Sequence, residues 1–208
     1  MTRNLLRRDL IQEITARVLD GRLPAEARVN EVHLARELGV SRTPLREALI
    51  GLADRGMLVS APGRGFLVPP LEPGEARRLY PLVAELESLA LRWTSPLDLA
   101  GLPDALDLVT DEMAETLEAG GDLSVVDERW HALLLSRCEN THLLRLIEQT
   151  KPLLKRYDGL YFGGAHRAKE SIDDHRRIAA SLRAGDVPAA AELLVRNWVR
   201  SLALLGRE

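Results

Sequence analysis

Residues 39–49 read GVSRTPLREAL, and this stretch predicts a helix that begins after a tight turn. Gly39 can end the preceding helix, Ser41 or Thr43 can cap the next one, and Pro44 is tolerated in a first helical turn. The apolar residues that follow recur at helical spacing and predict one face packed against a core. These residues are Leu45, Ala48, Leu49 and Leu52.

The segments on either side of this helix complete a recognisable order of elements. An amphipathic helix carries Leu6, Leu10, Ile14 and Val18 at i, i+4 spacing, and a second short helix is expected at residues 31–38. Downstream, the apolar segments MLVS and GFLV are separated by APGRG, which predicts a hairpin with two glycines in its loop. Helix, helix, turn, helix and hairpin is the order of a winged helix-turn-helix.

The polar side chains of this unit suit DNA. Ser41, Arg42, Thr43 and Arg46 occupy the first turn of the third helix, which in this motif enters the major groove. The two arginines are four residues apart and project from the face opposite the leucines. Arginine can bond bidentately to guanine, and serine or threonine can reach phosphate or base. The hairpin tip, Gly63-Arg64-Gly65, supplies a flexible loop with a cation.

The stretch GVSRTPLREAL, followed by LADRGMLVSAPGRGFLV, closely resembles the DNA-binding domain of the GntR family of bacterial transcription regulators. The upstream segment DLIQEITARVLDGRLPAEARVNEVHLARELGV is similar as well, so the resemblance covers residues 5–69. It implies that Arg42, Thr43 and Arg46 contact operator bases or backbone and that the hairpin tip reaches the minor groove. One position departs from the family, because Val32 stands where a DNA-contacting arginine is usual.

From Pro73 onward every apolar pattern has helical period. Helices are expected near residues 73–93, 103–119, 122–139, 141–161, 167–184 and 187–205. Short connections between six helices predict an antiparallel bundle. The predicted fold is therefore mainly α, with a winged helix-turn-helix domain at residues 1–70 and an all-helical domain at 71–208; the boundary is Pro69-Pro70.

Composition narrows the class of protein. The chain has 208 residues, 46% hydrophobic and 28% charged, which is typical of a globular protein. Residues 1–70 hold 11 arginines and 8 acidic residues, whereas the remainder has an acidic excess, so only the first domain suits a polyanion. Lack of a long apolar run excludes a membrane helix, and the single Cys138 fits a reducing compartment. We expect a bacterial cytosolic protein, associated with the nucleoid when bound to DNA.

Histidines are the candidate metal ligands of the second domain. Asp127 and His131 lie four residues apart on one predicted helix, and His175 lies within another. A carboxylate and two imidazoles form a plausible shell for Zn²⁺, Mn²⁺ or Ni²⁺. A simple Asp–His hydrogen bond within the helix is the alternative that this spacing leaves open.

The helical domain resembles the FCD ligand-binding domain of the FadR-like branch of GntR regulators. The similar segments are RRLYPLVAELESLAL, VDERWHALLLSRCENTHLLRLIE and SIDDHRRIAASLRAGDVPAAAELLVRNWV. Many FCD domains hold a divalent metal with one Asp and three His, and the metal helps to fix a carboxylate effector. The resemblance implies Asp127, His131 and His175 as ligands, with Asn197 as a weak fourth in place of the usual histidine. The alternative is a metal-free site in which the same four residues hydrogen-bond the effector.

The effector itself is less defined. FCD domains that sense small carboxylates often carry an arginine in the first helix of the domain, which is missing from LYPLVAELE. Arg129, Arg156 or Arg167 could supply a replacement cation, and the sequence does not choose among them. Trp130 and Tyr157 could line the pocket, although an aromatic residue in such a helix more often belongs to the core. Arg129 and Tyr157 are taken as the candidate effector contacts. A larger or less acidic effector than a small carboxylate is equally compatible.

Together these features predict a homodimeric transcription regulator, with no enzymatic activity, that binds a pseudo-palindromic operator and a small-molecule effector. One alternative is a DNA-binding protein whose second domain only dimerises, and a metal-dependent enzyme is a distant third. The sequence leaves open the effector, the operator, the target genes, the metal and the sign of regulation, although repression is the expected one.

Overall fold

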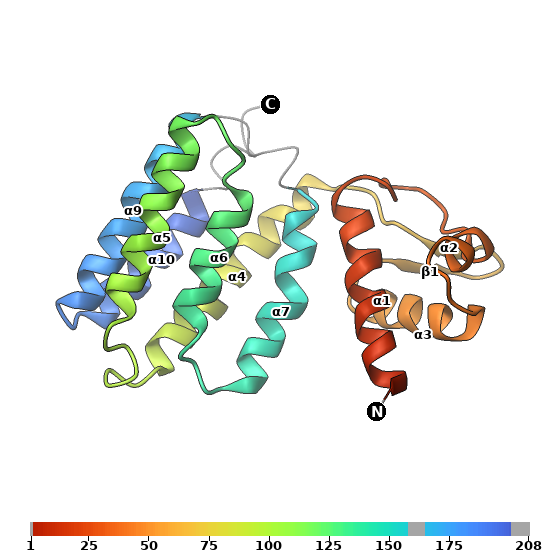
Figure 1. Ribbon diagram of the computed structural model, residues 1–208, viewed down its shortest axis with the longest axis horizontal. Helices are drawn as coiled ribbons and strands as arrows, with labels where there is room; N and C mark the ends of the chain where they lie inside the picture. Colours follow the sequence, from red (N-terminus) through yellow and green to blue (C-terminus); the bar gives the residue numbers. More distant parts are fainter. Residues whose placement is uncertain (1, 158–164, 201–208) are drawn as a thin grey trace. The chain divides into compact units, whose positions relative to one another are not determined.

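The computed structural model describes residues 2–157 and 165–200 and divides into two compact units (Figure 1). The first unit contains the residues up to Glu75 together with Gln149–Tyr157. The second contains Ala76–Glu148 and the described residues after 164. Each unit has a hydrophobic core of its own.

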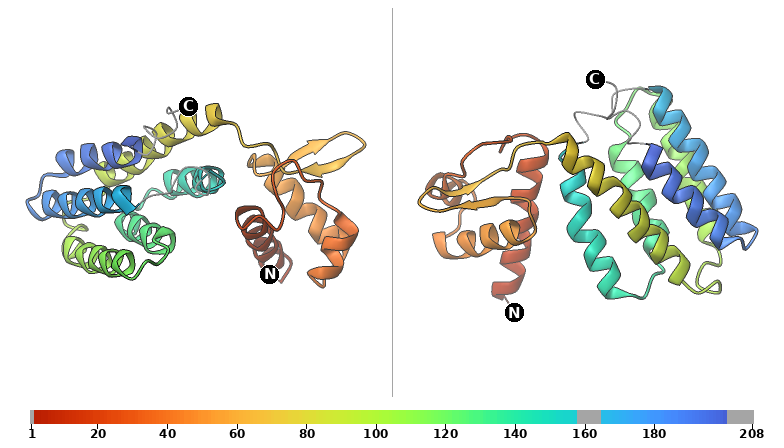
Figure 2. Two further views of the ribbon diagram at one scale, coloured as in Figure 1. Left: turned by 90° about the horizontal axis from the view of Figure 1, so that it is seen from above. Right: turned by 180° about the vertical axis from the view of Figure 1, so that it is seen from behind.

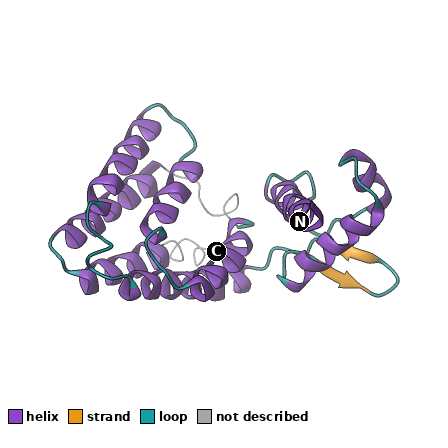
Figure 3. Ribbon diagram, turned by 60° about the horizontal axis from the view of Figure 1, so that its bottom comes forward, coloured by secondary structure: helices purple, strands orange, loops and turns teal. Residues whose placement is uncertain are grey.

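The first unit contains three helices and a hairpin in the predicted order. These elements are α1 (Thr2–Leu19), α2 (Glu31–Glu37), α3 (Arg42–Asp54), β1 (Val59–Ala61) and β2 (Gly65–Leu67). Within the described residues the two strands are the whole of the β-structure (Figure 3). They pair antiparallel with Ser60 opposite Phe66, and a bridge from Arg28 to Leu67 extends the sheet edge.

The core of this unit is built from the apolar stripes that the sequence predicts. Its members from α1, α3 and the hairpin are fully or nearly fully buried: Leu10, Ile14, Val18, Leu45, Ala48, Leu49, Leu52, Met57, Leu58, Phe66 and Val68. The side chain of Leu6 lies outside the described residues. Gly63 and Gly65 have φ of +70° and +76°, a left-handed conformation that suits glycine and closes the hairpin tightly.

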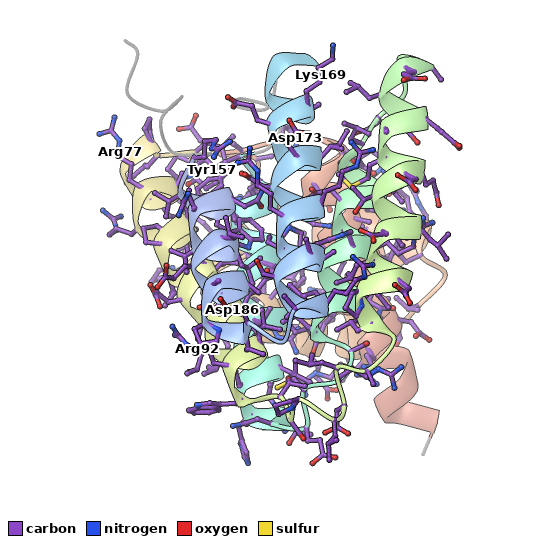
Figure 4. The ribbon with its side chains drawn as sticks, turned by 90° about the vertical axis from the view of Figure 1, so that its left-hand side faces the viewer. Arg77, Arg92, Tyr157, Lys169, Asp173 and Asp186 are labelled. Carbon is purple, nitrogen blue, oxygen red and sulfur yellow. The ribbon has the colours of Figure 1, made fainter. Side chains whose placement is uncertain are left out.

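The second unit is helical. Its elements are α4 (Pro73–Trp93), α5 (Leu102–Glu118), α6 (Ser124–Leu135), α7 (Thr141–Lys155), α9 (Ala165–Arg183) and α10 (Val187–Arg200), of which α4 and α7 extend into the first unit at one end. Figure 2 shows α4, α5, α6, α9 and α10 packed side by side. Asp186 lies at the turn between α9 and α10 (Figure 4), where its carboxylate accepts a hydrogen bond from the Ala189 amide and caps α10.

Two helices end earlier than the sequence predicts. The helix expected at 122–139 ends at Leu135, because Cys138 turns inward to a buried position and Asn140 starts the next helix. The Asn140 side chain accepts hydrogen bonds from the amides of His142 and Leu143 and so caps α7. Helix α7 ends at Lys155 rather than 161. The sequence also predicts a break between helices at Gly163-Gly164; this break and the last residues of the final helix, 201–205, lie outside the described residues.

The bundle core confirms the predicted fold class. Its central residues are buried: Leu91, Leu102, Leu106, Met113, Trp130, Leu134, Ile178, Leu182 and Leu194. A smaller cluster joins α4, α6 and α7 through Ala90, Leu135, Cys138, Leu143 and Ile147. The chain is thus mainly α, with a winged helix-turn-helix followed by a helical bundle. No helix of the described part combines the length and the apolar character needed to cross a membrane.

The neighbours Leu49 and Ile50 on α3 test this packing, since Leu49 is fully buried and Ile50 is 45% exposed. We expect Leu49→Ala to lower the free energy of unfolding by about 2–5 kcal/mol, because it leaves a cavity in the core. Ile50→Ala should change it by less than about 1 kcal/mol. Urea unfolding followed by circular dichroism measures both, and equal losses would contradict the assigned face.

Candidate functional sites

The first turn of α3 presents its polar residues to solvent. Ser41 occupies the N-cap position, and Arg42, Thr43 and Arg46 are exposed, while Leu45 on the opposite face is fully buried. The hydroxyl of Ser41 makes no capping hydrogen bond, so the predicted cap is confirmed in position only. This arrangement leaves the first turn able to meet a groove of DNA.

A groove of about 520 Å³ lies beside this turn. Its lining comes from the segment before α2, the start of α2, the start of α3 and the hairpin: Arg28, Val29, Asn30, Glu31, Val32, Arg42, Arg64 and Gly65. Within the part of the chain that the structure describes, the side chains of Arg28, Arg42 and Arg64 have no ion-pair or hydrogen-bond partner. Three unpaired guanidinium groups around one groove form a site for phosphate or base contacts.

Arg46 is held at the edge of this groove. Its Nη1 donates to both carboxylate oxygens of Glu31 at 3.1 Å, and its guanidinium lies 5.8 Å from the centre of the Phe66 ring. Of the predicted DNA contacts, the structure therefore gathers Arg42, Arg64 and Gly65 along the groove and places Arg46 next to it. Val32 is 63% exposed there, so the departure noted in the sequence lies on the same surface.

The second unit brings together Asp127, His131 and His175. One ligand atom from each of the three lies within 4.8 Å of the others. The Nε2 atoms of His131 and His175 are each 3.8 Å from an oxygen of Asp127. Two atoms bonded to one ion at about 2.0–2.2 Å lie roughly 3–4 Å apart, so this spacing fits a metal shell.

Hydrogen bonds at the other ring nitrogens define the tautomers of both histidines. His131 Nδ1 lies 2.7 Å from Glu87 Oε2, and His175 Nδ1 lies 3.4 Å from the sulfur of Met113. An ionised carboxylate and a thioether only accept hydrogen bonds, so both contacts favour the tautomer that carries its proton on Nδ1. Each Nε2 would then carry a lone pair within 3.8 Å of an Asp127 oxygen, as a metal ligand requires.

The cluster is nearly closed to solvent except at Asp127. His131 and His175 are 2% and 0% exposed, whereas the side chain of Asp127 is 37% exposed. The ring of Trp130 stacks on His175 with centres 3.7 Å apart. Burial, and then the neighbouring His131, hold the pKa of His175 well below its ordinary value of 6.5, so this ring is neutral. Its Nε2 is buried without a hydrogen-bond partner among the described residues.

Asn197, the expected fourth ligand, is held by residues of α9. Its Nδ2 donates to the Ser171 hydroxyl at 3.3 Å, and its side chain also helps to hold down the pKa of Asp174. Burial raises the pKa of Asp174, while Arg200 and Arg177 counteract that effect. Coordination by Asn197 stays a prediction, and it requires the amide oxygen to turn toward the histidines.

Arg129, the first candidate effector contact, pairs with Glu112 on the surface of the bundle. Arg129 lies two positions after Asp127 on α6, a spacing that directs the two side chains to different faces of the helix. The side chain of Arg167 lies outside the described residues.

The second candidate effector contact, Tyr157, belongs to the first unit. Its hydroxyl donates to Glu75 and accepts from the amide of Glu72 at 3.2 Å, and burial raises its pKa to about 12. The neighbouring Arg156 donates to the carbonyl of Pro69 at 2.6 Å. Both side chains thus have partners in the segment that follows the hairpin, and an effector contact by Tyr157 stays a prediction.

Three residues of these sites escaped the sequence interpretation. Arg28 and Glu31 precede residues 39–49, the stretch on which it concentrated, and Glu87 resembles any glutamate of an amphipathic helix. A signal for Glu87 exists, because it falls on the apolar face of α4, between the buried Val83 and Leu91. A charged residue on a buried face indicates a partner.

A winged helix-turn-helix with a cationic groove, followed by a helical bundle with its own buried polar site, defines a DNA-binding transcription regulator. Residues 6–68 match the family described as bacterial regulatory proteins, gntR family, and residues 78–199 match the FCD domain. The chain therefore belongs to the GntR family of transcription regulators, in the group with a C-terminal FCD domain, and it is a regulator rather than an enzyme.

Individual relatives agree with this assignment. The HTH-type transcriptional regulator McbR of Escherichia coli is 27% identical over 196 residues, covering 89% of this chain and 86% of that protein. A probable D-xylose utilization operon transcriptional repressor of Paenarthrobacter nicotinovorans is 28% identical, covering 95% and 87%. The solved structure of E. coli McbR/YncC has a TM-score of 0.72 at 26% identity, covering 96% of both chains.

The two ends of α3 offer a matched test of the DNA face. Arg42→Ala should weaken binding to a DNA site selected by the protein by about 1–3 kcal/mol, because an unpaired arginine at the groove is removed. Arg55→Ala removes the same charge at the C-terminal end of α3 and should leave affinity nearly unchanged. Fluorescence anisotropy with labelled duplex measures both, and equal effects would contradict direct contact by Arg42.

The buried His175 predicts a pH dependence of stability in the metal-free protein. Below pH 6.5 the unfolded chain takes up a proton at His175 that the folded protein resists, so the free energy of unfolding falls as the pH falls. His175→Gln should flatten this fall, whereas His142→Gln, at an exposed position, should not. Thermal unfolding from pH 7.5 to 5.0 with a chelator measures it, and an unchanged slope in His175→Gln would refute the prediction.

Proposed function

We propose that this protein is a homodimeric regulator whose affinity for a pseudo-palindromic operator is set by a small-molecule effector bound in the bundle beside a divalent metal. Residues 1–70 form the DNA-binding domain, and residues 71–208 form the effector-binding and dimerisation domain. The observation that carries the proposal is the convergence of Asp127, His131 and His175, with both Nε2 atoms 3.8 Å from oxygens of one carboxylate.

The donor set supports a metal. Two neutral imidazoles and a carboxylate suit Zn²⁺, Mn²⁺ or Ni²⁺, and the buried Nε2 of His175 lacks the hydrogen bond that a structural histidine would make. Glu87 accepts the Nδ1 proton of His131, an arrangement typical of metal-bound histidines. The bound ion would supply a Lewis-acidic position for an oxygen ligand of the effector.

Asp127 is the exposed member of the cluster and defines the side from which an effector would approach. A carboxylate or another oxygen-bearing molecule fits, since such ligands complete the shell of a metal with few protein donors. Differential binding of the effector to two arrangements of the protein would change operator affinity.

The geometry of DNA recognition supports the proposed homodimer. One recognition helix contacts a half-site, and two-fold symmetry places a second helix on the other half. The relative from Paenarthrobacter nicotinovorans is named a repressor, as are the gluconate operon repressors of Bacillus, and repression is proposed here on that similarity. Because its proposed target is DNA, we infer that the protein acts in the bacterial cytoplasm.

Elemental analysis of the purified, unchelated protein tests the metal. We expect about one divalent ion per chain, lost in Asp127→Asn and in His175→Gln because each removes a donor. Asp173→Asn, an exposed carboxylate on α9 (Figure 4), is the control that should keep its metal.

Asn197→His extends this test to the fourth position. It should tighten metal binding if residue 197 faces the cluster, and isothermal titration of metal into the chelated protein measures it. A protein that takes up no Zn²⁺, Mn²⁺ or Ni²⁺ would refute the metal site and favour a metal-free sensor or a purely dimerising bundle.

A further inference from the structure

We propose that Glu31 is a positioning residue for base recognition: its carboxylate fixes the guanidinium of Arg46 so that the remaining donors read a guanine. The protein's DNA-binding role rests on its family, so this proposal is independent of the metal and the effector. Glu31 is not among the predicted DNA contacts, and the proposal explains why a carboxylate lies in the groove.

Three elements hold the guanidinium of Arg46. Glu31 lies in the first turn of α2, Arg46 in α3, and Phe66 in β2. The Glu31 carboxylate accepts from Nη1 at 3.1 Å on both oxygens, and the Phe66 ring lies 5.8 Å from the guanidinium carbon. A flexible arginine is thus restrained on two sides before it meets DNA, which lowers the entropy lost on binding.

The bonding leaves the recognition donors available. An arginine has five N–H donors, and those of Nε and Nη2 in Arg46 have no protein acceptor within the residues that the structure describes. Bidentate bonding to O6 and N7 of guanine needs two such donors in a fork. The side chain of Arg46 is 58% exposed, so these donors can reach a base edge.

A carboxylate at the position of Glu31 lowers the affinity of the groove for DNA phosphates. Its side chain is only 13% exposed, yet it lines the groove with Arg28, Arg42 and Arg64. A carboxylate among these arginines repels phosphate and lowers affinity for DNA of any sequence. It also lies against the hairpin, since a Cβ on Gly65 would stand 3.4 Å from Glu31 Oε1. Such a carboxylate favours specificity over general affinity.

The test compares two variants that remove one negative charge each from the same unit. Glu31→Gln keeps the shape of the side chain but weakens its hold on Arg46. Glu37→Gln is the control, because Glu37 pairs with Arg17 and His33 and does not line the groove. Both use the full-length protein, and circular dichroism checks that each folds.

The probes are a duplex selected by the wild-type protein from a random library and a duplex of equal length without the selected motif. We expect Glu31→Gln to lower the ratio of specific to non-specific affinity by about 10-fold and to relax the preference for guanine at one position of each half-site. Glu37→Gln should keep the wild-type ratio and preference, even if removal of a charge tightens binding to both duplexes.

Arg46 variants separate the proposal from a phosphate contact and keep it testable if Glu31→Gln misfolds. Arg46→Lys keeps the charge but loses the fork, so it should relax the same guanine position. The double variant with Glu31→Gln should lower the ratio of specific to non-specific affinity little further than Arg46→Lys alone, because both substitutions act through one contact. A wild-type ratio in Glu31→Gln, a guanine preference retained in Arg46→Lys, or a selected site without guanine would each overturn the proposal.

Discussion

A carboxylate in the middle of a helical bundle is stable only if it is hydrogen-bonded, and Glu87 has none of its surface exposed. It accepts from His131 Nδ1 at 2.7 Å and from Trp198 Nε1 at 2.8 Å, so α4, α6 and α10 must converge on one point. The same bond decides which nitrogen of His131 faces Asp127. The chemistry of the cluster thus depends on a residue that is not one of its ligands.

The first unit uses the same device at its surface. Glu31 holds Arg46 as Glu87 holds His131, and in both cases a carboxylate from a neighbouring helix orients a side chain whose other nitrogens stay available. The difference lies in burial: Arg46 remains exposed to a large polyanion, while His131 is closed off and suits an ion or a small molecule. In both units, therefore, a carboxylate outside the contact itself orients the side chain that would meet the ligand.

The helices and the DNA face could be predicted because they depend on local periodicity. Arg42 and the buried Leu49 lie on opposite faces of α3 for a reason visible in their spacing, and Asp127 with His131 follows from a separation of four residues. His175 was a candidate from its residue type, and the family resemblance joined it to the same site. Glu31 and Glu87 were missed, since their partners lie 15 and 44 residues away and only tertiary packing brings them together. The early end of α6 also depends on packing, because the helical pattern continues past Leu135.

The tautomers of the two buried histidines test the central claim most directly, since the whole cluster depends on which nitrogens carry protons. Two-dimensional ¹⁵N–¹H spectra of the chelated, full-length protein at neutral pH, with His131 and His175 assigned by substitution, distinguish the tautomers. Protonated Nδ1 and unprotonated Nε2 in both rings are the expected result. A proton on Nε2 of either neutral ring would contradict the claim, because Nδ1 would then carry no proton to donate to Glu87 or Met113.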